Sequence, residues 1–598
     1  MINTTCNTTK MVVFVVALVV VDVVVMWWYL SPTTTSGDGS SQPDPPDVTY
    51  PPPPSNSPMG IYSQAAVVST SDLCPAIGKQ MLEMGGSAVD AAIATLLCDG
   101  VCVMQAMGVG GGHIMTIYNK TEGKTYSLMA RETAPAAATR DMFVKNATLS
   151  TFGPLAAGVP GELKGYQEAH KRFGRLPWRD LFQPTIKLCE EGVPVNKRLE
   201  YQFQLEEKLI RASPTAVAML LNSTEGKLPK EGDLIKLPQL AKTLRVIAES
   251  DNKADELYNG SLTKMFVQDI QAGGGIITEE DMNNYQVRWE EPVTASLSGD
   301  LTLFSAPLPG SGILVAFMLR LLDGFLQLAD SDLRRSQVMI ETFKHAYGRR
   351  TDLGDPHFVN ASLLERVIFN LTDEETILGL RGKIFYNTTS QDPRWYGGDY
   401  EHEDHGTNNI VVLAPDGSAV CATSTINTPF GSQFVSISTG ILLNDQMDDF
   451  STPGEPNYWG VSPSEANYIE PGKRPQSSMS PTIIVDSSGD VRLAIGGAGG
   501  TTITTQTTAV AAKNLWLGKN IKEAIDGARF HHQLLPMEVS YEYGVVKDMV
   551  GGWQHIGHKT KRRSKTQYSL GVVTGVARLQ SNITANCDWR RLGAVAGF

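Results

Sequence analysis

A hydroxyl side chain at the start of a predicted hairpin is the first group in the sequence that could do chemistry. Apolar runs over 408–413 and 418–424, joined by an Asp-Gly turn at Asp416, predict two antiparallel strands. Thr407 and Thr425 are equally distant from Asp416, so folding about the turn places them opposite each other. A small hydroxyl residue that follows a glycine and faces polar partners suggests a reactive site without specifying one.

A glycine-rich segment further along could bind an anion. A predicted strand over 491–495 leads into Gly-Gly-Ala-Gly-Gly at 496–500, and a helix is expected over 501–518. Backbone N–H groups at such a helix start point towards negative charge. Close packing of the loop on the sheet is the alternative.

Standard cofactor and metal motifs are missing from the sequence. It contains no Walker A sequence, no G-x-S-x-G elbow and no H-E-x-x-H pair, and Gly108–His113 does not fit G-x-G-x-x-G. The run His402-Glu403-Asp404-His405 lacks the spacing of a zinc site, so a solvated loop is expected there. We therefore predict no cofactor and no metal.

Two short predicted helices, over 72–84 and 87–98, are joined by Gly-Gly and should fold back on each other. Ser87, with Asp90 three residues later, predicts a capping box for the second helix. The hairpin brings Cys74 near Cys98, so a disulfide is predicted between them in an oxidising compartment. Cys102, one helical turn beyond, is the rival partner, and three buried thiols are the other alternative.

Composition limits the classes of protein that the chain can belong to. Its 598 residues carry 51 Lys and Arg against 63 Asp and Glu, a net charge of −12, which argues against a general nucleic-acid binder. The length suggests several domains. Alternating helical and strand patterns suggest a layered α/β sandwich.

An apolar stretch of twenty residues, 11–30, is long enough to span a bilayer, although it contains Asp22. A buried soluble helix and a cleaved signal peptide are the weaker alternatives. We predict a cytoplasmic tail (1–10), a signal anchor (11–30) and a Pro/Ser/Thr-rich stalk (31–58), which makes a type II plasma-membrane protein with an extracellular body. Eight glycosylation sequons fit that orientation: Asn119, Asn146, Asn222, Asn259, Asn360, Asn370, Asn387 and Asn582.

Ordered motifs across the ectodomain resemble the γ-glutamyltranspeptidase family. The matching stretches include GGSAVDAAIATLLC, ARETAP, AAGVPGELKGY, RFGRLPWRDLFQP, GDPHFV, DGSAVCATSTINTPFGS, NDQMDDF, RPQSSMSPTIIV and GGAGGTTITT. The resemblance implies an N-terminal-nucleophile hydrolase with an αββα sandwich built from both chains of a self-cleaved precursor. The two chains would form a heterodimer of a large-subunit ectodomain (59–406) and a small catalytic subunit (407–598).

The same resemblance implies a mechanism. Cleavage between Gly406 and Thr407 would free an α-amino group that acts as base for the Thr407 hydroxyl. Thr407 would attack the γ-glutamyl carbonyl of glutathione, and water or an acceptor amino acid or dipeptide would then take the acyl group. Thr425 would position the hydroxyl, and the N–H groups of Gly499 and Gly500 would form the oxyanion hole.

The resemblance also implies how the glutamyl group binds. Arg131, Ser477 and Ser478 would hold the α-carboxylate. Asp449, Asn427 and Gln446 would receive the α-ammonium. Glutathione and other γ-glutamyl compounds are the substrates expected for such a clamp.

Three positions depart from the family pattern. His405 stands where a glycine is usual, Asn409 where a histidine is common, and Gln446 where mammalian members have glutamate. We expect activity to be retained. The alternatives are an impaired, uncut surface scaffold or a preference for glutathione S-conjugates.

Overall fold

The computed structural model describes residues 46–221, 226–398, 406–454, 463–563, 570–579 and 582–598. The predicted tail, anchor and most of the stalk, the run His402–His405, Cys6 and Asn222 lie outside the described residues. Among the residues that are described, no helix has the length and apolar character needed to cross a membrane.

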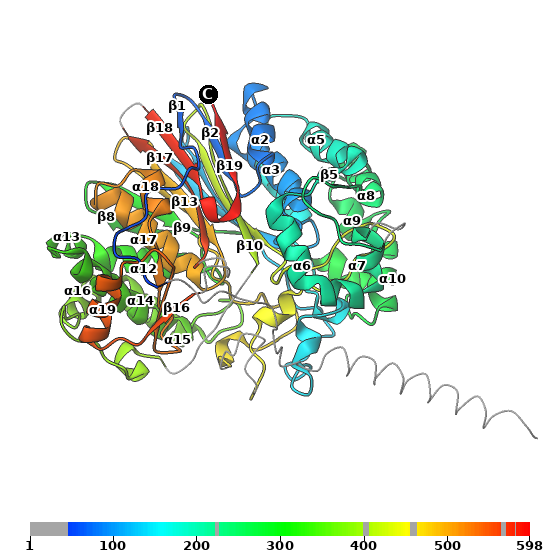
Figure 1. Ribbon diagram of the computed structural model, residues 1–598. Coiled ribbons are helices and arrows are strands. Elements are labelled where there is room, and N and C mark those ends of the chain that lie inside the picture. Colours follow the sequence, from blue (N-terminus) through cyan, green and yellow to red (C-terminus); the bar gives the residue numbers. More distant parts are fainter. Residues whose placement is uncertain (1–45, 222–225, 399–405, 455–462, 564–569, 580–581) are drawn as a thin grey trace, which may run out of the picture. The chain divides into compact units, whose positions relative to one another are not determined.

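Two seven-stranded antiparallel sheets form the centre of the unit that runs from Pro46 to Phe598 (Figure 1). The first contains, in spatial order, β1 (Gly60–Tyr62), β18 (Asn582–Cys587), β17 (Val572–Leu579), β13 (Val491–Ala498), β12 (Thr482–Val485), β9 (Leu301–Ser305) and β8 (Val293–Leu297). The second contains β19 (Ala594–Gly597), β2 (Ala66–Ser69), β10 (Thr407–Leu413), β11 (Ala419–Thr425), β3 (Gly112–Asn119), β4 (Lys124–Ala130) and β7 (Arg288–Glu290).

Apolar faces hold the layers together. The two sheets pack on each other through buried side chains such as Val68, Val411, Ile483, Ala494 and Val576. Helices cover both outer faces, which confirms the predicted αββα sandwich. The main covering helices of the second sheet are α2 (Cys74–Glu83), α3 (Ala88–Cys102), α4 (Glu162–Phe173), α5 (Trp178–Glu191) and α8 (Pro238–Glu249), and those of the first are α12 (Gly312–Leu322), α14 (Asp332–Arg350), α17 (Thr502–Trp516) and α18 (Ile521–Asp526).

Smaller elements complete the unit. The remaining helices are α6 (Lys197–Ala212), α7 (Pro214–Leu220), α9 (Asp255–Asn259), α10 (Thr263–Ala272), α11 (Glu279–Asn284), α13 (Phe325–Leu328), α15 (Ala361–Thr372), α16 (Glu374–Arg381) and α19 (Lys547–Ile556). The short strands are β5 (Val193–Pro194), β6 (Leu234–Ile235), β14 (Phe530–His531), β15 (Val539–Tyr541) and β16 (Thr560–Arg562).

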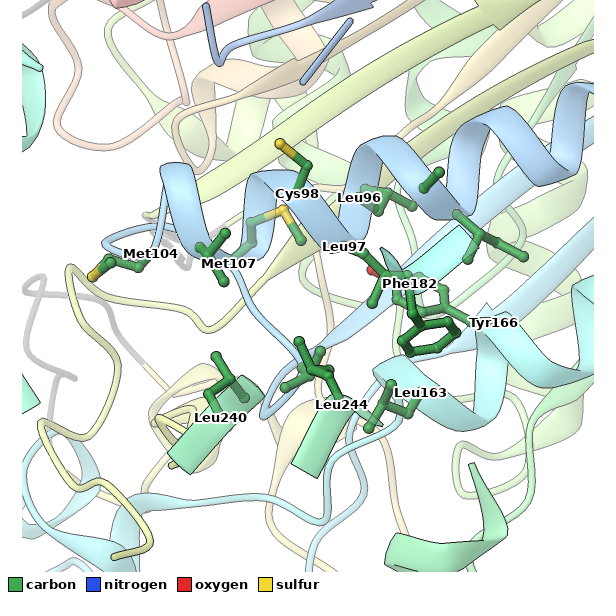
Figure 2. Close-up of a cluster of buried hydrophobic side chains, with 14 of the residues drawn as sticks. Leu96, Leu97, Cys98, Met104, Met107, Leu163, Tyr166, Phe182, Leu240 and Leu244 are labelled. Atoms are coloured by element: carbon green, nitrogen blue, oxygen red, sulfur yellow. The ribbon is translucent and has the colours of Figure 1, made fainter. Parts of the chain in front are cut away.

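The largest apolar cluster lies between α3 and the helices around it. Figure 2 shows Leu96 and Leu97 of α3 beside Tyr166 of α4 and Phe182 of α5, with Leu244 of α8 below them. All five side chains are buried. This packing fixes α3 as a rigid support behind β10.

The β10–β11 hairpin has the predicted register, with Thr407 opposite Thr425. Successive strand residues point to opposite faces. Val411 lies between the sheets and Val412 packs towards the helices, so Thr407 shares the inter-sheet face and Asn408 the helical face. The nucleophile candidate therefore faces the first sheet.

The predicted helix pair near the N-terminus is also confirmed. Ser87 and Asp90 form the capping box of α3. Cys74 and Cys98 form the disulfide, with their Cα atoms 5.5 Å apart. The rival assignment of Cys102 is wrong, because its thiol stays free although it lies 3.8 Å from the Cys98 sulfur. Cys189, Cys421 and Cys587 are free and buried as well.

The end of the predicted stalk contacts the folded unit. Val48 forms a β-bridge with Val546, and the backbone N–H of Ser55 donates to Asp526 at 2.9 Å. The compact unit, which begins at Pro46, therefore includes this part of the predicted stalk.

The described sequon asparagines all reach the surface. Asn119 and Asn370 are half-buried, and the others are exposed: Asn146, Asn259, Asn360, Asn387 and Asn582.

Candidate active site

Thr407 is fully buried at the first position of β10, and its hydroxyl has no hydrogen-bond partner. The Thr425 hydroxyl, from the facing strand, donates to the carbonyl oxygen of Gly406 at 2.7 Å. The same hydroxyl accepts from the backbone N–H of Asn427 at 2.8 Å. Thr425 thus holds the peptide unit that precedes Thr407, while the Thr407 oxygen is left available.

The backbone at Gly406 needs a glycine. Its φ of +78° lies in the left-handed region. A Cβ there would come within 1.7 Å of the Asn427 carbonyl oxygen. Close packing of chain on chain therefore fixes the conformation of the predicted cleavage site.

The glycine-rich segment passes directly over the hairpin. A Cβ on Gly496 would meet the Asn409 side chain at 2.3 Å. Asn409, which stands at one of the departures from the family pattern, forms hydrogen bonds with the hydroxyls of Thr423 and Thr574 at 2.7 and 2.8 Å. The amide is thereby a structural link between the two sheets.

The proposed oxyanion-hole residues follow on the same strand. Gly499 and Gly500 have φ values of +120° and +64° before α17 begins. The Gly499 carbonyl accepts from the Thr502 hydroxyl at 2.5 Å. The pair thus forms the tight turn between β13 and α17.

Arg131 directly follows β4 and is fully buried. Its Nε donates to the Pro475 carbonyl at 3.0 Å, and Nη2 donates to the Gln476 carbonyl at 3.3 Å and pairs with the Asp449 carboxylate. Asp449 also accepts from the Gln446 amide at 2.5 Å. Three residues that were expected to bind substrate are therefore in direct contact.

The remaining predicted substrate ligands lie beside this cluster. Ser477 and Ser478 follow Gln476, and the Ser478 hydroxyl accepts from Arg350 at 3.0 Å. Asn427 donates to the backbone carbonyl of Asp445 at 3.1 Å. Asn427 also donates to Thr425, and Asp445 directly precedes Gln446, which donates to Asp449. A continuous path of contacts therefore runs from Thr425 to Arg131.

Four polar atoms along this set are buried without a hydrogen bond among the described residues: Thr407 Oγ1, Asn427 Oδ1, Gln446 Oε1 and Arg131 Nη1, the last of which lies 3.8 Å from the Glu132 carboxylate. A buried polar atom with no hydrogen bond costs roughly 1–3 kcal/mol. One donor and two acceptors match the carboxylate and ammonium of a free amino acid. A bound zwitterion would remove that cost.

Two acidic residues were missed by the sequence reasoning. Both carboxylate oxygens of Glu132 are buried without a side-chain hydrogen bond in the described chain, 3.8 Å from Arg131 Nη1 at the nearest, and burial raises the pKa of Glu132 to about 8 although Arg131 opposes the shift. Burial also raises the pKa of Asp445 well above its ordinary value. Glu132 lies in the stretch ARETAP and Asp445 in NDQMDDF. Their positions were therefore visible in the sequence, but their burial could not be predicted from it.

A second missed contact lies behind the nucleophile strand. The Asn408 amide donates to Asp99 of α3 at 2.7 Å and accepts from the Thr70 hydroxyl at 2.5 Å. Burial raises the pKa of Asp99 to about 7. Asn408 is thus held on the helical face of the sheet, opposite the face that Thr407 shares.

One group of possible metal ligands exists in the described part of the chain, Cys74, Cys98 and Cys102. The disulfide uses two of the three sulfurs, so this cluster cannot act as a three-thiolate site in the structure.

The four-layer sandwich and the buried Thr407 at the start of β10 fit the class of N-terminal-nucleophile hydrolases. The fold is shared with a cephalosporin acylase from Bacillus halodurans, at a TM-score of 0.78 and 22% identity over 94% of this chain and 99% of that one. The family model Gamma-glutamyltranspeptidase matches residues 74–598, and the chain belongs to that family.

Relatives agree with this assignment. Scoloptoxin SSD14 of Scolopendra dehaani is 45% identical over 551 residues, covering 91% of this chain and 94% of the relative. Glutathione hydrolase 5 proenzyme of Homo sapiens is 36% identical, covering 90% and 93%. The gamma-glutamyltranspeptidase of Helicobacter pylori is similar in structure, with a TM-score of 0.50 and 28% identity over 56% of this chain and 95% of that one.

Proposed function

We propose that the chain is a self-cleaving γ-glutamyltransferase and glutathione hydrolase with Thr407 as nucleophile. The observation that carries the proposal is the buried, unpartnered Thr407 hydroxyl, joined by contacts to the Arg131–Asp449 cluster. Relatives named glutathione hydrolase proenzymes support it over most of the chain.

Self-cleavage comes first. The Thr407 oxygen attacks the Gly406 carbonyl carbon, and its proton passes to the peptide nitrogen, which leaves as the new α-amino group. Water then hydrolyses the resulting ester. The Thr425 hydroxyl, 2.7 Å from the Gly406 oxygen, stabilises the negative charge that grows on that oxygen. The products are a Gly406 carboxylate and a free Thr407.

Acyl transfer follows with the same oxygen. The neutral α-amino group takes the proton of the Thr407 hydroxyl, which attacks the γ-glutamyl carbonyl of glutathione. The proton passes to the leaving amine, cysteinylglycine. Water or an acceptor amino acid or dipeptide then releases the acyl group, with Gly499 and Gly500 N–H groups on the oxyanion.

The substrate clamp uses buried atoms that lack a hydrogen bond in the described part of the structure. Arg131 Nη1 can take the α-carboxylate while Nη2 keeps its pair with Asp449. The unpartnered oxygens of Asn427 and Gln446 accept from the α-ammonium, which also lies near Asp449. Only a γ-linked glutamyl group presents both charges, so this clamp favours γ- over α-linked substrates. Ser477 and Ser478 complete the carboxylate side.

The membrane arrangement belongs to the same proposal. The apolar segment 11–30 would anchor a type II protein, with chains 59–406 and 407–598 together outside the cell. Exposed sequon asparagines such as Asn146 and Asn387 support that orientation.

N-terminal sequencing of the small chain, combined with a γ-glutamyl-anilide assay, tests the function. We expect a chain that begins at Thr407, turnover with the anilide, and neither property in Thr407→Ala. A single uncut chain with no turnover would favour the scaffold alternative. Comparing glutathione with its S-conjugates as donors separates the remaining alternative.

A further inference from the structure

The guanidinium of Arg591 contacts the nucleophile residue itself. Its Nη1 donates to the carbonyl oxygen of Thr407 at 2.5 Å. Arg591 ends the short 3₁₀ turn Trp589–Arg591, which connects β18 to β19. A positive charge therefore lies against Thr407, the residue whose α-amino group self-cleavage would free.

Buried ion pairs hold the turn that carries Arg591 in place. Arg590 pairs with Glu542 at 2.7 Å and with Asp588 at 3.1 Å, and Arg529 also pairs with Asp588. The backbone N–H of Arg591 donates to the Asp588 carbonyl at 3.1 Å. These contacts hold the turn in place without involving Thr407, and the turn thereby positions the Arg591 guanidinium beside β10.

We propose that Arg591 is a positioning residue that keeps the α-amino group of cut Thr407 unprotonated at neutral pH. The inference rests on the proposed function. An α-amino group ordinarily has a pKa of about 7.7–8.0, so most of it would be protonated and unable to act as base at pH 7. A nearby like charge disfavours the protonated form. We expect Arg591 to lower the pKa of this α-amino group by about one unit.

The other positive groups act in the same direction. Arg198 of α6 faces Arg591, and burial together with Arg198 lowers the pKa of Arg591. A guanidinium nonetheless stays charged at neutral pH. Asp588 opposes the effect, but its charge is shared between Arg529 and Arg590.

The acidic groups around the strand oppose it weakly. Asp99 of α3 lies behind Asn408, and Asp445 binds the Thr428 hydroxyl at 2.6 Å beyond Asn427. Burial raises the pKa of Asp99 to about 7, so Asp99 carries little negative charge below neutral pH, and burial also raises the pKa of Asp445. Glu162 of α4 lies behind Ser424.

The pH dependence of kcat/KM for a γ-glutamyl-anilide tests the role, because its acid limb reports the base in the free enzyme. In the cut protein, Arg591→Gln should move the midpoint of that limb up by about one pH unit. Its kcat/KM should fall about tenfold at pH 6 and differ less than about threefold from wild type at pH 9. Arg591→Lys, which keeps the charge, should leave the midpoint in place. Arg175→Gln, far from Thr407, is the charge-loss control.

An unmoved midpoint in Arg591→Gln, or an equal loss at every pH, would overturn the inference. A Gln variant that stays uncut would also overturn it, since Arg591 would then act on cleavage. Arg591→His is an independent check: it loses its charge above its own pKa, so its limb should also move up. Wild-type protein with no turnover at all would refute the proposed function instead.

Discussion

The two ends of the β10–β11 hairpin share one ladder of hydrogen bonds but differ in their surroundings. At the turn, Asp416 is paired with the exposed Arg175 at 2.7 Å and accepts from the Ser418 N–H at 2.9 Å. At the other end, Thr407 is buried and its hydroxyl is unpartnered. The comparison shows that the hairpin gives both ends the same backbone geometry, and that only the Thr407 end combines burial with a hydroxyl that lacks a hydrogen bond within the described chain.

Gly406→Ala should have the largest effect on this contrast. The added Cβ would clash with the Asn427 carbonyl and occupy a left-handed conformation, so we expect self-cleavage to slow at least 100-fold. A time course on reducing gels measures it. Gly417→Ala at the turn is the matched control, because its φ is +82° but its Cβ meets the flexible Lys120 side chain. Cleavage of Gly406→Ala at the wild-type rate would contradict the prediction.

Arg131→Gln should leave self-cleavage intact and lower kcat/KM about 100-fold or more. The change removes the proposed carboxylate ligand and leaves Asp449 buried without its guanidinium. Arg131→Lys keeps the charge but loses the forked guanidinium, so its kcat/KM should lie between those of wild type and Arg131→Gln. Steady-state kinetics on cut protein checks this, and a wild-type kcat/KM in Arg131→Gln would remove Arg131 from the site.

Glu132→Gln should reduce the pH dependence of stability. Because burial raises the pKa of this carboxyl to about 8, the folded protein holds a proton that the unfolded chain releases near pH 4.5. Stability therefore falls as the pH rises through this window, by up to about 1.4 kcal/mol per pH unit for one proton. Thermal midpoints at pH 5 and pH 8 should differ less in the variant than in wild type. Equal differences would show that Glu132 ionises normally.

Arg175→Gln should have the smallest effect. It removes an exposed ion pair, which typically contributes no more than about 1 kcal/mol. We expect unchanged kinetics and a thermal midpoint within a few degrees of wild type. A loss of turnover would show that the two ends of the hairpin are coupled.

Local sequence signals predicted the parts of the site that are close in the chain. The Asp-Gly turn determined the Thr407–Thr425 register, and the capping box at Ser87 determined where α3 begins. The contact between Arg131 and Asp449 spans 318 residues, and no periodicity reports such a distance. It was reached only through the family resemblance.

Burial and backbone crowding were beyond the sequence for a physical reason. The raised pKa of Glu132 and the fit of Gly406 depend on neighbours supplied by distant segments. Arg591 reaches Thr407 from a turn 184 residues away, outside every motif that carried the resemblance. Such long-range contacts are also where the function is decided.

The strand order of the two sheets has a consequence for the cut protein. Each sheet contains strands from both sides of Gly406: β1 pairs with β18 in one, and β2 lies between β19 and β10 in the other. Cleavage therefore breaks one covalent bond and no strand pairing. The two chains cannot separate on dilution without loss of both sheets, so their dissociation and their unfolding are a single event.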